Sequence, residues 1–335
     1  MDRHSVVFTG PRETAVQETT FTPTPEEVVV RTRFSAINAG TELLIYRGQA
    51  PQDLPADATL DSLDGDLSYP LRYGYAAVGD VTAVGDAVDD DWLDRTVFAF
   101  NPHDSAFAAE PDQLVPVPDD VAPTAMTMLP SIETATSLVL DGRPRVGERV
   151  VVFGAGVIGL FTLALLSTFP LDRLVAVEPL PARREQARRI GADAAVAPEH
   201  LDDALATDRT EGADLLYELS GEPAALDDAV AAAGYDSRVI VGSWYGTKRA
   251  SLDLGGGFHR DRVSIESSQV STLAPDSRGR WDKARRLDTA LDHLRRVDTD
   301  PLITHDLPFG DAPSAYDLLA DGRNDALQVL LCYDD

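Results

Sequence analysis

The stretch RVVVFGAGVIGLFTLALL, residues 149–166, is an apolar run that meets three spaced glycines and then continues apolar. This order predicts a strand, a tight turn and a helix. Gly154 permits the turn, Gly156 lets the backbone approach a pyrophosphate, and Gly159 lets the helix and the strand pack closely. The N-terminus of the helix also attracts phosphate charge. The stretch therefore predicts a dinucleotide site formed by Gly154, Ala155, Gly156, Val157, Ile158 and Gly159.

A second apolar strand supports this interpretation. It covers residues 174–178 and ends in Glu178, at about the distance from the glycines where a carboxylate binds the ribose hydroxyls. A carboxylate at this point repels a 2′-phosphate, so NAD is favoured over NADP. Arg183 and Arg184 leave NADP as the alternative cofactor, because a guanidinium there could pair with that phosphate.

Length and pattern predict two domains. The 335 residues exceed the usual size of one hydrophobic core. Short apolar runs broken by Gly, Pro and Asp fill the first part of the chain, which predicts β structure. Strands and helical stretches then alternate, which predicts an α/β fold with a doubly wound parallel sheet. We expect a β-rich catalytic domain from residues 1–123 and 270–335, and a Rossmann domain from residues 124–269. The acidic stretch 51–68 has no regular period and is interpreted as a surface insertion or lid.

The charge balance limits the partners. A formal net charge of −27 with 44% hydrophobic residues describes an acidic but globular chain. Nucleic acid and anionic membranes are therefore not expected as partners, and a small-molecule substrate is. Only Lys248 and Lys283 are lysines among the 29 basic residues. This bias predicts a halophile, because molar salt, with a Debye length of about 3 Å, screens the self-repulsion of an acidic protein. An arginine-favouring genome would explain the few lysines but explains the acidity less well.

Cys332 is the sole cysteine, so a disulfide framework and a cysteine-based zinc site are both excluded. The first residues lack an apolar signal stretch, and no apolar run approaches the roughly 20 residues that span a bilayer. The expected location is the cytoplasm, and a homodimer is the expected assembly.

Three segments carry a resemblance to a known family. They are Asn38-Ala-Gly-Thr-Glu42, Gly74-Tyr-Ala-Ala-Val-Gly79 and the turn at residues 146–148 that leads to Gly154. With the domain order, they resemble the medium-chain dehydrogenase/reductase superfamily over essentially the whole chain. The resemblance implies a GroES-like, partly open barrel beside the Rossmann domain, and a hydride transferred by NAD or NADP.

The zinc-ligand positions of that superfamily are altered here. Its zinc alcohol dehydrogenases carry a Cys where Ala39 stands and a His where Tyr75 stands, and the third ligand falls at about Leu129. Ala and Leu offer no ligand atom, and one tyrosine alone cannot hold zinc. The resemblance therefore implies an enzyme without catalytic zinc, and no metal is expected.

A subgroup of the superfamily is more similar still. Its first block reads S-G-I-S-x-G-T-E, and residues 35–42 of this chain, SAINAGTE, match it. The subgroup includes bacteriochlorophyllide dehydrogenase, and residues 69–71 ahead of Gly74 also resemble that enzyme. Motif similarity alone does not transfer its pigment substrate.

Without zinc, hydrogen-bond donors must polarise the substrate carbonyl. Thr41 occupies the position whose hydroxyl relays the substrate proton in the zinc enzymes, although a turn residue with a local hydrogen bond is the alternative. Tyr75 is a second candidate donor, and packing with one polar end is its alternative. His103, after a strand whose end borders the pocket in relatives, is a candidate general acid. Glu42 is a candidate for orienting Thr41 or Tyr75, or for a purely structural hydrogen bond.

Further cofactor contacts follow from the resemblance. Glu133 falls where relatives place a residue beside the nicotinamide. Gly242 and Ser243 follow the strand whose end should lie near the same ring, and Trp244 and Tyr245 come directly after them.

Three functions remain open on these residues. The leading one is a zinc-independent oxidoreductase that interconverts a secondary alcohol and a ketone. The second is reduction of an activated C=C bond, as in quinone and enoyl reductases. The third is a dinucleotide-binding sensor or assembly subunit whose catalysis has decayed, against which the retained Thr41 and glycine turn argue.

Overall fold

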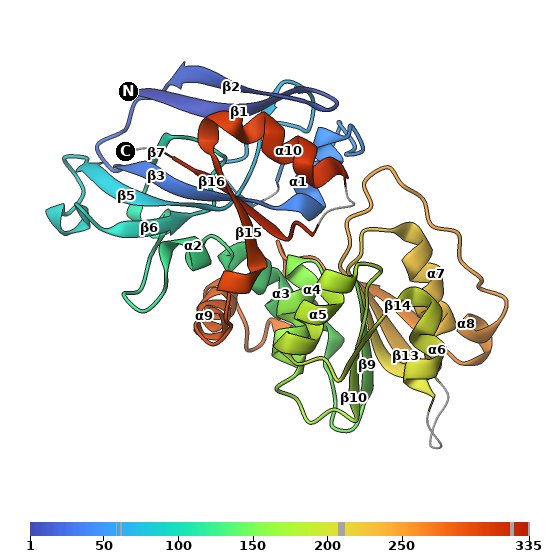
Figure 1. Ribbon diagram of the computed structural model, residues 1–335. Helices are drawn as coiled ribbons and strands as arrows, with labels where there is room; N and C mark the ends of the chain where they lie inside the picture. The colour runs from blue at the N-terminus through green and yellow to red at the C-terminus, as the bar shows by residue number, and fades with distance from the viewer. Residues whose placement is uncertain (58, 61, 207–211, 322–324, 334–335) are drawn as a thin grey trace. The chain divides into compact units, whose positions relative to one another are not determined.

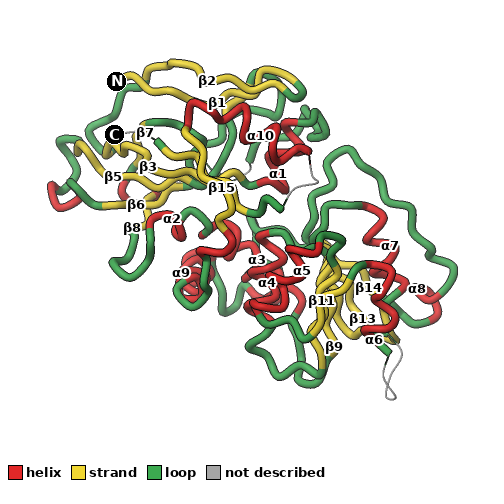
Figure 2. The backbone as a smooth tube through the Cα atoms, viewed as in Figure 1, coloured by secondary structure: helices red, strands yellow, loops and turns green. Residues whose placement is uncertain are grey.

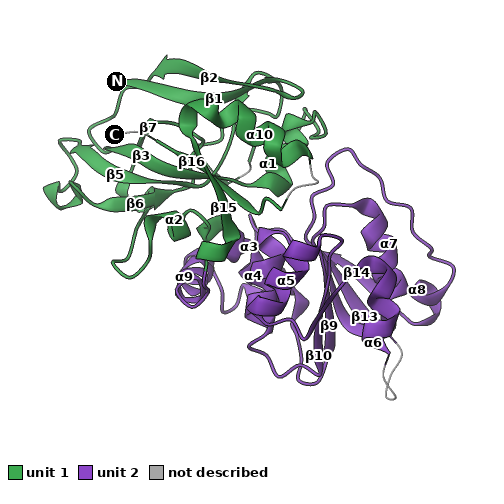
Figure 3. Ribbon diagram, viewed as in Figure 1, with its two compact units in different colours: residues 1–130, 299–335 green, residues 131–298 purple. Residues whose placement is uncertain are grey.

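The computed structural model describes residues 1–57, 59–60, 62–206, 212–321 and 325–333. The chain forms two compact units, residues 1–130 with 299–335 and residues 131–298 (Figure 3). Both boundaries fall later than the sequence pattern suggested. The second shifts because helix α9 (Lys283–Leu294) belongs to the second unit, where buried Arg286 bonds to Glu133 at 2.8 Å.

Unit 1 is β-rich and contains two sheets (Figure 1). Its larger sheet has the order β15-β16-β3-β5-β6-β8, with β7 also paired to β3, and its smaller sheet has the order β2-β1-β4. The strands are β1 (Asp2–Gly10), β2 (Glu13–Thr20), β3 (Val28–Ile37), β4 (Leu71–Arg72), β5 (Ala77–Val84), β6 (Thr96–Ala99), β7 (Ala106–Ala109), β8 (Leu114–Pro116), β15 (Ile303–Pro308) and β16 (Gln328–Cys332). The helices are α1 (Ala39–Tyr46), α2 (Pro123–Met126) and α10 (Ala312–Asp321).

The C-terminal segment completes unit 1. Strand β16 pairs antiparallel with β3, placing Leu331 opposite Ser35, and β15 pairs parallel with β16. Helices α1 and α10 contribute to an apolar core that includes Phe8, Ile45 and Tyr316. Residues 51–68, expected as a surface insertion or lid, also contribute Leu63 and Leu67 to this core.

Unit 2 is built on a parallel six-stranded sheet with the order β11-β10-β9-β12-β13-β14. Its strands are β9 (Arg149–Phe153), β10 (Arg173–Val177), β11 (Ala194–Val196), β12 (Ala213–Glu218), β13 (Ala233–Val241) and β14 (Ser264–Ser267). Its helices, besides α9, are α3 (Leu129–Gly142), α4 (Val157–Leu166), α5 (Pro181–Ile190), α6 (Leu201–Leu205), α7 (Pro223–Ala231) and α8 (Gly257–Arg260). Helices flank the sheet on both faces (Figure 2). The expected α/β fold with a Rossmann sheet is confirmed.

Local sequence explains these elements. All five residues of central strand β9 are buried, as expected for an apolar run between two neighbouring strands. Helix α5 begins with Pro181, has Arg188 and Arg189 in its last turn, and ends at Gly191 with a φ of +126°. A proline is a usual signal for the start of a helix. Cations in the last turn and a glycine just beyond it are usual signals for its end.

Candidate functional site

The dinucleotide turn of unit 2 has the geometry expected of its glycines. Gly154 follows β9 with a φ of +94°, and an added Cβ would lie 2.8 Å from the backbone of Ser220. A Cβ on Gly159 would lie 2.0 Å from the carbonyl oxygen of Gly154, so only glycine lets α4 approach the strand this closely. Gly156 begins α4 with open space around its missing side chain and with no side-chain cap on the helix.

These features fit a dinucleotide. The uncapped N–H groups at the start of α4 are suited to a pyrophosphate, and the open side of Gly156 lets it approach. Glu178 is buried directly after β10, where its carboxylate accepts from the backbone N–H of Ala155 at 2.9 Å and of Leu180 at 3.0 Å. These two bonds hold the carboxylate beside the glycine turn, and a carboxylate has further lone pairs for ribose hydroxyls.

The other expected cofactor contacts lie on neighbouring elements. Ser243 follows β13 and, like Gly242, donates its backbone N–H to the carbonyl oxygen of Glu218. Glu133 lies on α3 and pairs with Arg286 at 2.8 Å, and burial raises its pKa while Arg286 opposes that rise. Arg183 lies on α5. Arg184, one residue on, donates to the carbonyl oxygen of Glu178 at 2.7 Å.

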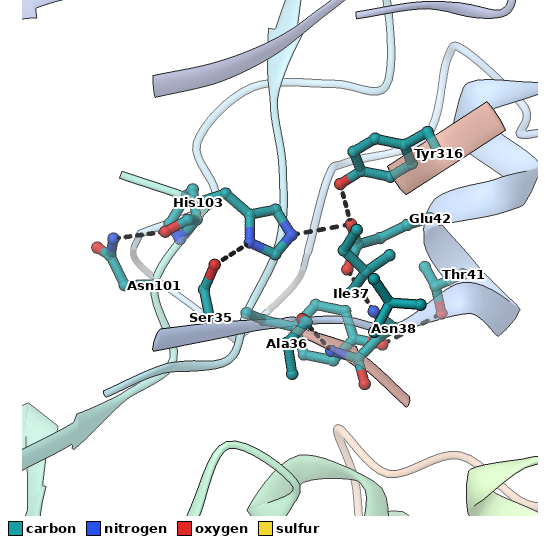
Figure 4. Close-up of polar contacts among 12 residues, drawn as sticks. Ser35, Ala36, Ile37, Asn38, Thr41, Glu42, Asn101, His103 and Tyr316 are labelled. Carbon is teal, nitrogen blue, oxygen red and sulfur yellow. Dashed lines mark hydrogen bonds and ion pairs between the residues drawn. The ribbon is translucent and has the colours of Figure 1, made fainter. Parts of the chain in front are cut away.

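A buried polar network occupies the core of unit 1 (Figure 4). Nε2 of His103 lies 3.0 Å from Oε2 of Glu42, and its Nδ1 lies 2.7 Å from Oγ of Ser35. Tyr316 on α10 donates to the same carboxylate oxygen at 2.5 Å, and the phenol of Tyr333 lies 2.9 Å from Oγ of Ser35. Four of these side chains are fully buried: His103, Glu42, Ser35 and Tyr316.

One arrangement of protons satisfies this network. An ionised Glu42 accepts from Tyr316, from Nε2–H of His103 and, at 2.7 Å, from the backbone N–H of Asn38. Nδ1 of His103 then accepts from Ser35, whose oxygen accepts from Tyr333. Three donors around one buried carboxylate replace the water that it loses.

The network holds the start of α1, the helix that carries Thr41. Asn38 is the N-cap of α1, and the carboxylate of Glu42, in the first turn of the helix, accepts from the backbone N–H of Asn38. Gly74 makes room for the imidazole, because an added Cβ would lie 2.7 Å from the ring of His103. Its φ of +119° also disfavours any other residue.

Thr41 and Tyr75 form a separate pair. The phenol of Tyr75 lies 3.4 Å from Oγ1 of Thr41, and both side chains are partly exposed. Burial raises the pKa of Tyr75, and the charge of Glu42 raises it further against the hydrogen bond to Thr41. Tyr75 therefore keeps its proton and acts as a donor.

The structure thus gathers the four predicted catalytic residues into unit 1 in two groups. Thr41 and Tyr75 form a partly exposed pair, while Glu42 and His103 are buried. Two further members of the network, Tyr316 and Tyr333, come from the far end of the chain, and no sequence motif predicts them. The glycine at position 74 is the one sequence signal of this packing, because a side chain there would collide with the ring of His103.

The donor chemistry does not fit a catalytic zinc ion. Ala39 and Leu129 carry no ligand atom, and Leu129 is fully buried. Among the described residues, no group of three or more His, Cys, Asp or Glu side chains could hold a metal ion. Glu42 and His103 bond to each other and would supply two ligands, where a protein zinc site needs three or four.

Comparison with known proteins agrees with the fold. Residues 157–287 match the family model described as zinc-binding dehydrogenase. The D-guloside 3-dehydrogenase of Escherichia coli K12 is 26% identical over 311 residues, covering 87% of this chain and 88% of that protein. The (R,R)-butanediol dehydrogenase of Bacillus subtilis is 25% identical over 283 residues, covering 74% of this chain and 77% of that enzyme.

Solved structures share the architecture. An Escherichia coli CFT073 structure described as a short chain alcohol dehydrogenase complexed with NADH has a TM-score of 0.76 at 20% identity, covering 99% of both chains. A Sinorhizobium meliloti 1021 dehydrogenase bound to NADP has a TM-score of 0.77 at 16% identity, also over 99% of both chains. The fold and the relatives make the chain similar to oxidoreductases of the zinc-binding dehydrogenase type, in the medium-chain dehydrogenase/reductase superfamily. Within it, the chain is similar to NAD(P)-dependent alcohol and polyol dehydrogenases.

Every described helix is too short or too polar to cross a bilayer.

Proposed function

We propose that this protein is an NAD-dependent dehydrogenase that interconverts a secondary alcohol and a ketone without catalytic zinc. The observation that carries the proposal is the Tyr75–Thr41 hydrogen-bonded pair, which stands where the superfamily's zinc enzymes hold a ligand and a proton-relaying hydroxyl. The proposal is supported by the absence of ligand atoms at Ala39 and Leu129.

The cofactor and the substrate have separate sets of residues in this proposal. The nicotinamide supplies or accepts the hydride when it is bound. The turn from Gly154 to Gly159 and the start of α4 would hold its pyrophosphate, and Glu178 its adenosine ribose. NAD is preferred because a second anion beside the buried carboxylate of Glu178 is repelled.

Thr41 and Tyr75 polarise the substrate oxygen. The hydroxyl of Thr41 accepts from Tyr75 and has its own proton free to donate to a ketone oxygen. Since Tyr75 has a raised pKa, it strengthens this donor by hydrogen bonding and does not ionise. The growing charge on the oxygen is thus stabilised in the transition state. The proton of the Thr41 hydroxyl completes the alcohol, and solvent returns a proton to that partly exposed hydroxyl.

Glu42 and His103 have a positioning role in this proposal. His103 uses both ring nitrogens inside the network and is fully buried, so we assign it to holding Glu42 instead of acting as a general acid. Glu42 in turn holds the first turn of α1, and with it Thr41.

The substrate is proposed to be a polyhydroxylated secondary alcohol. The named relatives act on a guloside and on butanediol, and both names describe molecules with neighbouring hydroxyl groups. A panel of polyols and ketones, assayed with NAD and NADH at molar salt, tests the reaction class. Turnover only on conjugated enones or quinones would favour the C=C reductase, and no turnover with bound NADH would favour the decayed sensor.

Metal content and cofactor choice are tested separately. Elemental analysis of the purified protein should give no stoichiometric zinc, and one zinc per chain after tag removal would contradict the proposal. Fluorescence titration should give tighter binding of NADH than of NADPH. The opposite order would show that Arg183 or Arg184 outweighs Glu178.

A further inference from the structure

A second hydrogen-bonded cluster lies at the carboxyl edge of the sheet in unit 2, and the proposed chemistry does not use it. Glu218 is the last residue of β12 and is fully buried. Its Oε2 accepts from the phenol of Tyr245 at 2.5 Å. Its Oε1 accepts from the backbone N–H of Ser220 at 2.8 Å and from the hydroxyl of the same residue.

The same residues tie together the loops that follow β12 and β13. The carbonyl oxygen of Glu218 accepts from the hydroxyl of Ser243 at 3.3 Å, and that hydroxyl accepts from the N–H of Gly221 at 2.9 Å. Lys248 donates to the carbonyl oxygen of Gly221 at 2.5 Å. Both loops therefore have their backbone fixed through Glu218 and its partners.

The order of the strands predicts which part of a bound dinucleotide these loops would contact. The order reverses direction beside β9, with β10 and β11 on one side and β12, β13 and β14 on the other. A dinucleotide binds across such a point, outside the carboxyl ends of the strands. Its pyrophosphate belongs at the turn after β9 and its adenosine ribose at Glu178, after β10. The nicotinamide half is then left to the loops after β12 and β13.

We propose that Tyr245 is a positioning residue for the nicotinamide half of the cofactor, because its hydrogen bond to Glu218 fixes the loops after β12 and β13. This inference rests on the proposed function. Burial raises the pKa of Tyr245, and the hydrogen bond to Glu218 raises it further, so its phenol stays a neutral donor. If that donor is removed, a buried carboxylate loses one partner and the loops must rearrange to satisfy it.

The test compares two ligands on one variant. Tyr245→Phe removes the donor and keeps the ring, and calorimetric titration measures the affinity for NADH and for ADP-ribose. ADP-ribose contains the adenosine and pyrophosphate parts and lacks nicotinamide. We expect the Kd for NADH to rise about tenfold, as loss of a charged hydrogen bond predicts, while the Kd for ADP-ribose changes less than twofold.

The controls separate positioning from general stability. Tyr235→Phe is the matched control, since Tyr235 lies on β13 with 70% of its surface exposed, and it should change neither affinity. Equal weakening of both ligands, or no weakening, would overturn the role of Tyr245. If Tyr245→Phe does not fold, Ser243→Ala takes its place, because it removes the hydroxyl that joins the same two loops, and the same selective loss is expected.

The same experiment also tests the proposed function, through ligand binding by the wild-type protein. Wild-type protein that binds neither ADP-ribose nor NADH would contradict dinucleotide binding itself, and the inference about Tyr245 would fall with it. Wild-type protein that binds both, with a variant that shows no selective loss, would contradict only the role of Tyr245.

Discussion

Nε2 of His103 lies 3.0 Å from Oε2 of Glu42, and neither side chain reaches solvent. A buried carboxylate is tolerated only when donors surround it. Here the imidazole supplies one donor, Tyr316 a second and the N–H of Asn38 a third. The pair therefore ties the loop between β6 and β7, which carries His103, to the first turn of α1.

Removing one of these donors should destabilise unit 1. Tyr316→Phe keeps the ring and deletes the hydroxyl that bonds to Glu42 at 2.5 Å. A hydrogen bond to a charged group contributes about 1.5–3 kcal/mol, so the free energy of unfolding should fall by that amount. Chemical denaturation measures it, with the exposed Tyr235→Phe as control. A loss as small as that of the control would show that the bond to Glu42 contributes nothing.

Stability should also fall at alkaline pH. Burial raises the pKa of Tyr316 and of Tyr333 well above 10.0, with the charge of Glu42 adding to both shifts. The unfolded chain releases these protons near pH 10, while the folded chain keeps them, so this stabilisation is complete below pH 10 and is lost as pH rises further. Denaturation midpoints measured from pH 8 to 11 should decline above about pH 10. Tyr316→Phe should make the decline shallower, and an unchanged slope would contradict the assignment.

The sequence predicted the parts of the site that are close together in the chain. The turn from Gly154 to Gly159 and the strand ending at Glu178 are local patterns. Gly154 and Gly159 each meet a steric requirement of the structure, and Gly156 leaves open space. Thr41 and Tyr75 could be named as candidate donors only because both positions belong to motifs of one superfamily, and their hydrogen bond to each other was not predicted. Spacing alone would not have joined them.

The sequence could not predict the buried network for a physical reason. Tyr316 is 274 positions from Glu42 and Tyr333 is 298 positions from Ser35, so only the tertiary fold brings them together. Helix patterning places Tyr316 in the core but does not name its partner. The later domain boundary has the same origin, since the buried bond between Arg286 and Glu133 spans 153 positions.

Gly74 should be intolerant of a side chain. Gly74→Ala would force a left-handed backbone at φ +119° on a residue with a Cβ and would press that atom within 2.7 Å of the His103 ring. We expect a loss of several kcal/mol, from strain of about 1–3 kcal/mol and from overpacking of similar size. Gly40→Ala is the matched control, because it lies in α1 with nothing within 4 Å of the added atom. The control should be neutral or slightly stabilising, and equal melting temperatures would contradict the packing described for Gly74.

Salt should stabilise the protein. The net charge of −27 makes the folded chain repel itself at low ionic strength, and screening relieves that repulsion. The melting temperature should therefore rise steeply between low and molar potassium chloride. Sucrose at matched viscosity is a control for solvent effects other than screening. A flat response to salt would show that the acidity is compositional and would remove the support for a halophilic origin.

The chemistry is tested at the Tyr75–Thr41 pair. Thr41→Val removes the hydroxyl and keeps the branched shape, so NADH affinity should stay nearly unchanged while turnover falls, because the lost interaction matters mainly in the transition state. A catalytic proton donor is typically worth about 10²- to 10⁴-fold, and a loss of that order is expected on a substrate identified by the polyol and ketone panel. Tyr75→Phe should lower turnover less, because the phenol lies 3.4 Å from Oγ1 of Thr41 and acts through it.

The double variant distinguishes a coupled pair, in which Tyr75 acts through Thr41, from two independent donors. If Tyr75 acts through Thr41, Thr41→Val with Tyr75→Phe should lose little more turnover than Thr41→Val alone, since the second change removes a partner that has already lost its acceptor. If the fold loss of turnover in the double variant equals the product of the two single losses, each hydroxyl contacts the substrate oxygen separately. Near-native turnover in all three variants would place the reacting groups elsewhere in the chain.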